Sequence, residues 1–337
     1  MSSKSAVPVS PEKVMSEPPE ENRGRSATSP SEIPARGWRD IAWRVVDAIQ
    51  KDQLSIIAAG VAFYMMLAIF PAIGVLVSLY GLFFDPAQIS GQISAFAGLL
   101  PKEAMEVLIS QLSQIASQDN ATLRLTAVTA LLMTFWSASQ GIRTLMQALN
   151  VAYGEDEKRG TIRFYATALV ITLGGVLSAM VALAILVAMP TVGELLGSPF
   201  DSLLSYARWP ILVIGMLLAL TVVYRFGPSR RKPRWAWVSW GAGVATGLWI
   251  IGTAVFSYYV ENFGSYNKTY GSAGALIILL LWFLLTAYVV LIGAEINAEM
   301  ERQTARDTTT GRPKPLGERG AYAANTVGPT PPPKMGH

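Results

Sequence analysis

The sequence predicts an all-α membrane protein, a bundle of six transmembrane helices with both ends of the chain in the cytoplasm. Three observations predict this class. Apolar residues make up 51% of the 337 residues and charged residues 15%, and the charges lie outside a few long apolar runs. Six of those runs are long enough to cross a hydrocarbon core of about 30 Å, which needs roughly 20 helical residues. Lys and Arg are concentrated in alternate connections between the runs.

Polar tails are predicted at both ends. Residues 1–35 are rich in Pro, Ser and Glu, and residues 304–337 have a similar character. Such segments cannot bury enough apolar surface to offset their ordering entropy. We therefore expect disordered cytoplasmic tails at 1–35 and 304–337 around a membrane domain at 36–303. No signal peptide is expected, because the first apolar run begins only near Leu54 and is too long for one.

The expected spans follow one another at Leu54–Leu82, Leu123–Ala148, Phe164–Met189, Trp209–Tyr224, Val238–Val260 and Ala275–Ile296. Pro71 in the first span should kink that helix near Leu67, as either a hinge or a structural bend. The fourth span is the shortest, and it either begins in the preceding loop or crosses a locally thin region. Gly243 and Gly247 in the fifth form a pattern of small residues that predicts close helix packing.

Basic residues fix the predicted orientation. Thirteen of them precede the first span or lie around the second and fourth connections, namely Arg36, Arg39, Arg44, Lys51, Arg143, Lys158, Arg159, Arg163, Arg225, Arg230, Arg231, Lys232 and Arg234, whereas the alternate connections hold only Lys102 with Arg124 at its edge, Arg208 and Lys268. Because cytoplasmic connections carry the excess of Lys and Arg, this bias places both termini inside. Topology and lipid head groups then account for the net charge of +4, so nucleic acid is not an expected partner.

The outer connections are predicted to hold amphipathic helices. From Pro101 to Ser117, apolar and polar residues take opposite faces at helical spacing. The connection from Val192 to Leu204 repeats the pattern more weakly and is broken by Pro199. Both segments are either packing elements or a lid over a cavity.

Three stretches carry a family resemblance: 52–64 (DQLSIIAAGVAFY), ending at Tyr64 and running on to Pro71; 136–143 (WSASQGIR), with Asn150 and Tyr153; and 262–274 (NFGSYNKTYGSAG), followed by 293–297 (GAEIN). Together they resemble the YihY/BrkB family of bacterial inner-membrane proteins, over roughly Trp38–Arg302. The resemblance implies a location in the bacterial inner membrane. It implies no settled activity, because the family has been labelled ribonuclease, virulence factor, and transporter or lipid flippase.

The residues argue against ribonuclease activity. Metal-dependent nucleases hold their ions with clustered His, Asp and Glu, since two cations must stabilise the attacking and leaving oxygens. The chain has no Cys, and its single His is the last residue, His337. The adjacent acids Glu155, Asp156 and Glu157 lie beside basic residues in a short inner connection, where a solvated turn is expected. We expect no enzyme activity, no metal site and no cofactor.

Polar residues within the spans are the best candidates for a path or binding site. A charged side chain deep in the bilayer costs about 2.5–3.5 kcal/mol, so such residues usually face the bundle interior. Glu295, near the inner end of the last span, is either such a residue or an ordinary helix-end residue. Glu299 and Arg302 are expected to form an exposed ion pair one turn apart.

A polar stripe marks the second span. Gln140, Arg143 and Gln147 share one face, with Asn150 a turn further on. The stripe either emerges into water at the helix end or lines an inner vestibule, with Arg143 close to Glu295.

The connection before the last span, 262–274, interleaves tyrosines with glycines around a single cation. It is either a tight interfacial hairpin or a re-entrant segment beside a wet cavity, where the cation would meet an anionic group. Its candidate residues are Tyr266, Asn267, Lys268, Tyr270 and Gly271.

The sequence thus favours a transporter or flippase-like protein for a lipid or amphipathic anion. The alternative is a scaffold that docks an envelope partner through its outer helices. Membrane lipids are the expected partners, with an envelope protein or a second copy of the chain as further partners. The substrate, its direction and any coupling ion are not readable, since no internal repeat is evident.

Overall fold

The computed structural model describes residues 23–83, 123–196, 200–263 and 273–331. Six helices of 27 to 36 residues dominate these ranges: α3 (Leu54–Phe83), α6 (Leu123–Ala152), α7 (Thr161–Leu196), α8 (Phe200–Phe226), α9 (Trp235–Phe263) and α11 (Ala273–Glu301). The shorter elements are η1 (Pro30–Glu32), α2 (Ala35–Lys51) and α12 (Tyr322–Asn325). Within the described ranges the one β pairing is an isolated bridge between Pro233 and Thr309. The all-α prediction is therefore confirmed.

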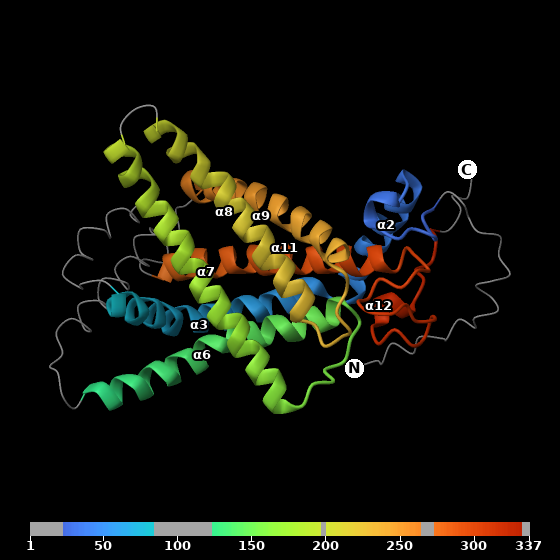
Figure 1. Ribbon diagram of the computed structural model, residues 1–337, viewed down its shortest axis with the longest axis horizontal. Coiled ribbons are helices and arrows are strands. Elements are labelled where there is room, and N and C mark those ends of the chain that lie inside the picture. Colours follow the sequence, from blue (N-terminus) through green and yellow to red (C-terminus); the bar gives the residue numbers. More distant parts are fainter. Residues whose placement is uncertain (1–22, 84–122, 197–199, 264–272, 332–337) are drawn as a thin grey trace.

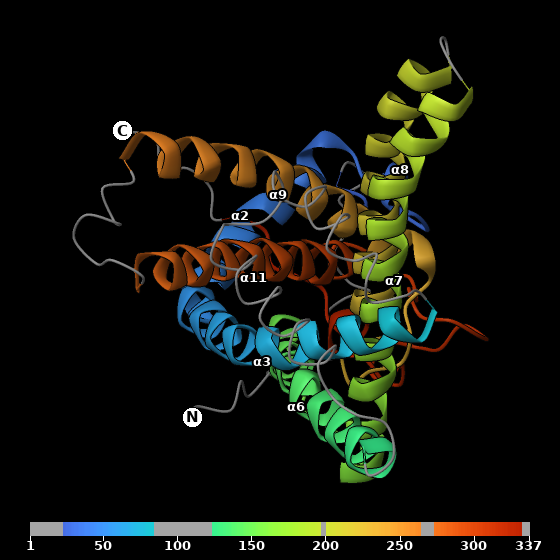
Figure 2. The ribbon, with the colours of Figure 1, turned by 90° about the vertical axis from the view of Figure 1, so that its left-hand side faces the viewer.

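The long helices fall into two groups that differ in direction. Helices α3, α6 and α11 run side by side, whereas α7 and α8 form a pair inclined to them (Figure 1). Helix α9 packs on both α8 and α11 and so joins the groups, as the view in Figure 2 also shows. Helix α2 packs on α11 at one end of the bundle. We call this the charged end; it holds α2, the connections 153–160 and 227–234, and residues 302–331.

Four of the described helices are long and apolar enough to cross a membrane, over Thr161–Leu186, Tyr206–Phe226, Trp235–Val260 and Leu276–Glu301. A fifth span arises if α2 and the first part of α3, which meet at a bend of 65°, are counted together. Many large apolar side chains on these helices point outward, including Val170, Ile251 and Val255. Such surfaces suit lipid chains rather than water. The structure supports a multi-pass membrane protein with four to five such spans among the described residues.

The structure bears on several predicted details of the helices. Helix α8 begins at Phe200, so the short fourth span does begin in the preceding loop. Pro71 lies within α3, and the kink expected near Leu67 stays a prediction. The weak amphipathic segment expected from Val192 to Leu204 is largely the continuation of α7 to Leu196 and the start of α8. The stronger outer helix, predicted at 101–117, lies outside the described residues.

Helix α9 packs tightly against α11, but not through the glycines that the sequence pattern indicated. A side chain at Gly243 or Gly247 would meet nothing within 4 Å, so that pattern does not pack a described helix. Gly241 instead lies directly against the carbonyl of Gly293 and the amide of Asn297. Asn297 locks the crossing, because its Oδ1 accepts from the Gly241 N–H (2.9 Å) and its Nδ2 donates to the Val238 carbonyl (3.2 Å). Glycine at both crossing positions lets the backbones meet.

Residues 23–35 and 304–331 are packed onto the charged end, which corrects the expectation of disorder for these parts of the tails. The buried guanidinium of Arg319 binds four backbone carbonyls, those of Lys314, Arg306, Ala324 and Ala305. Composition misled the prediction because it counts apolar side chains, whereas arginine–carbonyl hydrogen bonds hold this segment. Residues 1–22 and 332–337 lie outside the described part of the chain.

Candidate functional site

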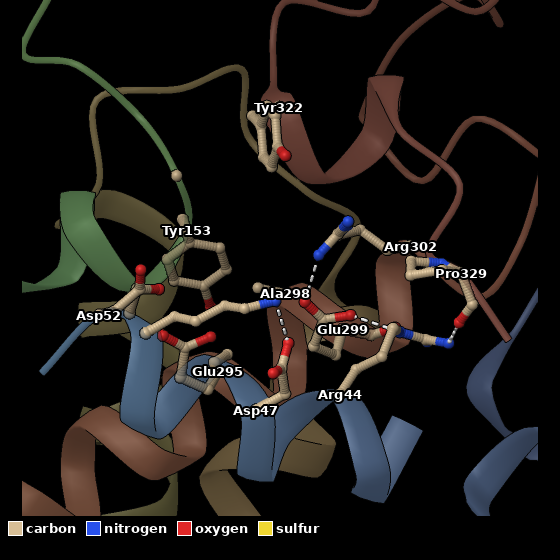
Figure 3. Close-up of a pocket in the computed structure, with 14 residues that line it drawn as sticks. Arg44, Asp47, Asp52, Tyr153, Glu295, Ala298, Glu299, Arg302, Tyr322 and Pro329 are labelled. Atoms are coloured by element: carbon tan, nitrogen blue, oxygen red, sulfur yellow. Dashed lines mark hydrogen bonds and ion pairs between the residues drawn. The ribbon is translucent and has the colours of Figure 1, made fainter. Parts of the chain in front are cut away.

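A cavity of about 270 Å³ lies at the charged end, between α2, the end of α6, the end of α11 and the C-terminal segment 322–329. Seven of its lining side chains are basic or acidic. Three are basic (Arg44, Lys51 and Arg302) and four are acidic (Asp47, Asp52, Glu295 and Glu299). Tyr153 and Tyr322 add aromatic walls. Figure 3 shows these side chains converging on one space from elements far apart in the sequence.

Glu299 is the organising residue of this cavity. One of its oxygens lies 2.6 Å from Nε of Arg44, and the other accepts from Arg302. Its side chain is 4% exposed, so the predicted pair with Arg302 exists but is not the exposed surface pair that was expected. The reason is α2, which covers the end of α11 and brings a second arginine to the same carboxylate.

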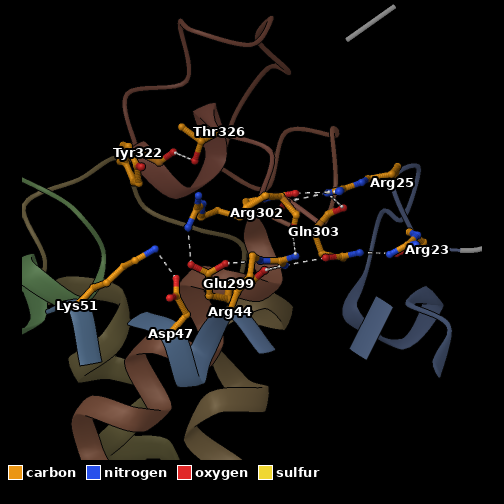
Figure 4. Close-up of polar contacts among 12 residues, drawn as sticks. Arg23, Arg25, Arg44, Asp47, Lys51, Glu299, Arg302, Gln303, Tyr322 and Thr326 are labelled. Atoms are coloured by element: carbon orange, nitrogen blue, oxygen red, sulfur yellow. Dashed lines mark hydrogen bonds and ion pairs between the residues drawn. The ribbon is translucent and has the colours of Figure 1, made fainter. Parts of the chain in front are cut away.

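Arg44 extends this contact to the C-terminal segment. It donates to the Glu299 carbonyl (3.0 Å), the Gln303 side-chain oxygen (2.7 Å) and the Pro329 carbonyl (3.1 Å). Arg25 acts in parallel, since its Nη2 donates to the Gly328 carbonyl (2.8 Å). Figure 4 shows this network joining the segment that holds Arg23 and Arg25 to α2, α11 and the C-terminal segment.

Glu295 lies one helical turn before Glu299 and also lines the cavity. It is 1% exposed and belongs to the candidate span Leu276–Glu301, so the structure places a buried carboxyl group where this apolar helix reaches the charged end. Across the cavity, Lys51 pairs with Asp47 at 2.6 Å on α2. The cavity therefore presents both signs of charge to anything that enters it.

Tyr153 closes the opposite wall of the cavity. Burial raises the pKa of its phenol, while the positive charge of Arg230 acts in the opposite direction. The Arg230 guanidinium lies 4.8 Å from the centre of the Tyr153 ring. Tyr153 thus stays neutral and separates the cavity from a second buried ion pair.

That second pair joins Arg230 to Glu301 at 2.6 Å, with both side chains fully buried. Thr308 donates a further hydrogen bond to Glu301 (2.7 Å). The sequence predicted Arg230 as one of several basic residues at the lipid head groups and gave no sign of this contact. Its partner is 71 residues away, and no local spacing signals it.

The polar residues predicted to share one face of α6 lie in different surroundings. Asn150 accepts from the Ser229 N–H (2.7 Å) and donates to Glu157 (3.0 Å), so it ties two connections together. Gln140 is half-buried and Gln147 is exposed. Arg143 contacts the rings of Trp136 and Tyr165, whereas Glu295 lines the cavity, so the structure does not bring these two charges together as predicted.

The acidic turn at 155–157 is less solvated than expected. The Glu155 side chain is 1% exposed; it pairs with Lys158 (2.8 Å) and accepts from the Tyr322 N–H. The C-terminal segment covers it, which local sequence does not reveal. The described residues contain no group of three or more Asp, Glu, His or Cys side chains placed to hold a metal ion.

The remaining candidates lie elsewhere. Tyr64 is on α3, 37% exposed, with its ring edge against Phe63, and it is not among the residues lining the cavity. Pro71 lies within α3. The candidates of the 262–274 connection, Tyr266, Asn267, Lys268, Tyr270 and Gly271, lie outside the described residues.

Comparisons with known proteins agree with this architecture. Residues 45–316 match the family model described as virulence factor BrkB. The chain is 31% identical over 252 residues to the ribonuclease-like protein YfkH of Bacillus subtilis, covering 73% of this chain and 90% of that protein. It is 26% identical to UPF0761 membrane proteins of Vibrio vulnificus, covering 82% of this chain and 88% of the relative, and of Photobacterium profundum, covering 79% and 82%. No solved structure matches the chain. The matches identify no catalytic family.

Proposed function

Because the chain belongs to the virulence factor BrkB family of membrane proteins, we propose that it is a transport protein that moves a lipid or amphipathic anion across the bilayer. In this proposal the protein has six spans, it lies in a bacterial inner membrane, and its charged end faces the cytoplasm. The gathering of Lys and Arg at that end supports the orientation. It is not an enzyme in this proposal.

One observation carries the proposal. A buried carboxyl group, Glu295, stands in the last candidate span and faces a cavity lined by ionisable side chains. Ionisable groups within spans are costly and typically mark substrate or proton paths.

The charges of the cavity refine the expected substrate. Three basic and four acidic side chains fit a head group that carries both signs better than they fit a simple anion. A zwitterionic lipid is therefore the substrate class that this end of the proposed path favours.

The test is lipid movement in liposomes that contain the purified protein. We expect faster inward-to-outward exchange of a fluorescent phosphatidylcholine than of the matching phosphatidylglycerol. Glu295→Gln should slow that exchange at least about tenfold, since glutamine keeps the size of the buried side chain but cannot ionise. Asp156→Asn changes an exposed acid outside the cavity and is the matched control.

Folded protein that moves neither lipid would contradict the proposal. That outcome would favour the alternative, a scaffold that docks an envelope partner through the outer segments. The decision would then rest on variants of residues 101–117.

A further inference from the structure

Arg143 is a buried cation outside the cavity. It lies in the second half of α6, and the residue is 8% exposed. Its guanidinium carbon is 4.9 Å from the centre of the Trp136 ring and 4.7 Å from that of Tyr165 on α7. The two rings are themselves stacked, with centres 4.9 Å apart and planes 3° from parallel. The side chain thus rests against an aromatic pair that bridges two helices.

No carboxylate among the described residues balances the charge of Arg143. Two other arginines with buried side chains pair with carboxylates, Arg44 with Glu299 and Arg230 with Glu301, and the buried Arg319 binds four backbone carbonyls. Within the described ranges Arg143 has no carboxylate within ion-pair distance, and its Nε has no hydrogen-bond acceptor. Its one hydrogen bond is a long one, 3.4 Å from Nη2 to the Trp136 carbonyl. Ring faces attract a guanidinium but do not neutralise it.

The depth of the group indicates where a counter-charge would come from. Tyr165 is four residues into α7, which begins at Thr161, or about 6 Å along the helix axis. The connection just before α7 carries Lys158 and Arg159, so this level is close to the edge of the bilayer. Trp136 is 49% exposed on the outside of the bundle. Tyr165 at such a level is typical of the head-group region, where lipid phosphates lie, and the ring of Trp136 is stacked on it.

We propose that Arg143, framed by Trp136 and Tyr165, binds a phosphate group, supplied by a lipid of the adjoining leaflet or by free phosphate. A guanidinium offers a planar pair of N–H donors that matches phosphate oxygens, and the buried Nε of Arg143 has no hydrogen-bond acceptor among the described residues. The exposed apolar surface of α7, at Ile162 and Val170, would carry the acyl chains and so favours the lipid source. This inference does not rest on the proposed transport, because a bound lipid need not cross the membrane.

The test measures binding to the purified full-length protein in detergent. The probes are dioctanoyl phosphatidylglycerol, dioctanoylglycerol, which has the same chains without phosphate, and inorganic phosphate. We expect phosphatidylglycerol to bind at least about tenfold more tightly than dioctanoylglycerol. Equal affinity of these two probes for the wild-type protein would overturn the proposal without any substitution.

Variants locate the site. Arg143→Gln should weaken phosphatidylglycerol binding at least about tenfold, and Arg143→Lys, which keeps the charge but loses the planar donors, about threefold. Arg163→Gln removes an exposed cation near the same helix end and should change affinity by less than about twofold. Unchanged affinity in folded Arg143→Gln would overturn the proposal, as would an equal loss in Arg163→Gln. If Arg143→Gln does not fold, unchanged affinity in Arg143→Lys overturns it.

The source of the phosphate is decided by the last probe. Inorganic phosphate that competes with the lipid at similar concentration, and only when Arg143 is present, would assign the site to free phosphate. Quenching of Trp136 fluorescence by a brominated-chain phosphatidylglycerol, absent in Trp136→Phe, would assign it to a lipid.

Discussion

At the scale of single residues, Glu299 joins two arginines at the charged end. Its carboxylate binds Arg44 and Arg302 at once, and its own side chain is nearly inaccessible. Buried ion pairs add little net stability when complete, but removal of one partner leaves a buried charge without compensation. The pair is therefore a point at which a small change has a large cost.

We predict that Glu299→Gln lowers the free energy of unfolding by about 3–5 kcal/mol, because it leaves the Arg44 guanidinium buried without a carboxylate. Asp47→Asn is the control, since its pair with Lys51 is exposed at 40% and 68% and should contribute less than about 1 kcal/mol. Thermal unfolding in detergent measures both. Equal effects of the two substitutions would show that burial of the Glu299 pair has no consequence.

Glu157 should make the stability of the folded protein depend on pH. Burial raises the pKa of Glu157, but hydrogen bonds from Arg159 and Asn150 outweigh it and lower the pKa from 4.5 to about 2. The ionised form is thus favoured by folding. Its contribution is complete above pH 4.5 and is lost as the pH falls toward about 2.

We therefore expect the unfolding temperature of the wild-type protein to fall more steeply than that of Glu157→Gln as the pH drops through this window. At neutral pH the variant should be the less stable of the two, because it lacks the ionised contacts. Parallel curves for the two proteins would contradict this assignment. Unfolding followed by tryptophan fluorescence at a series of acidic pH values makes the comparison.

At the scale of elements, the crossing of α9 and α11 depends on one glycine rather than on the pattern that first suggested packing. We predict that Gly241→Ala destabilises the protein by more than about 2 kcal/mol, because the added methyl group would meet the Gly293 carbonyl and the Asn297 side chain. Gly243→Ala has open space and should be neutral or stabilising by up to about 1 kcal/mol. Thermal unfolding of both variants checks this, and the reverse order would show that the crossing is elsewhere.

The elements also show what a sequence can predict. Long apolar runs predicted every long helix, because hydropathy alone identifies segments that must avoid water. Glu295 was identified as a candidate because a charged residue in such a run is conspicuous. The cavity around Glu295 was not predicted. It depends on the contact between Arg44 and Glu299, which are 255 residues apart, and local spacing does not encode a contact of that range. Residues 304–331 were missed because arginine–carbonyl contacts leave no compositional signal.

At the scale of the whole molecule, the charged end is the part that joins all of these features. It brings α2, the end of α11 and the C-terminal segment around one cavity, while the helices beyond it present apolar side chains outward. The central claim is that this cavity belongs to the path of a transported lipid. Ala48 on α2 lines the cavity and is half-buried, so it is a suitable place for a probe.

The most direct measurement is lipid exchange in liposomes by a single-cysteine variant, which is clean because the chain has no cysteine of its own. A charged methanethiosulfonate reagent would be attached at Ala48→Cys, with Asp156→Cys, exposed in the 153–160 connection, as the control. The account predicts that modification at position 48 slows exchange at least about tenfold, by filling the cavity, and that modification at 156 does not. Fully modified Ala48→Cys that moves lipid as fast as the unmodified protein would contradict it.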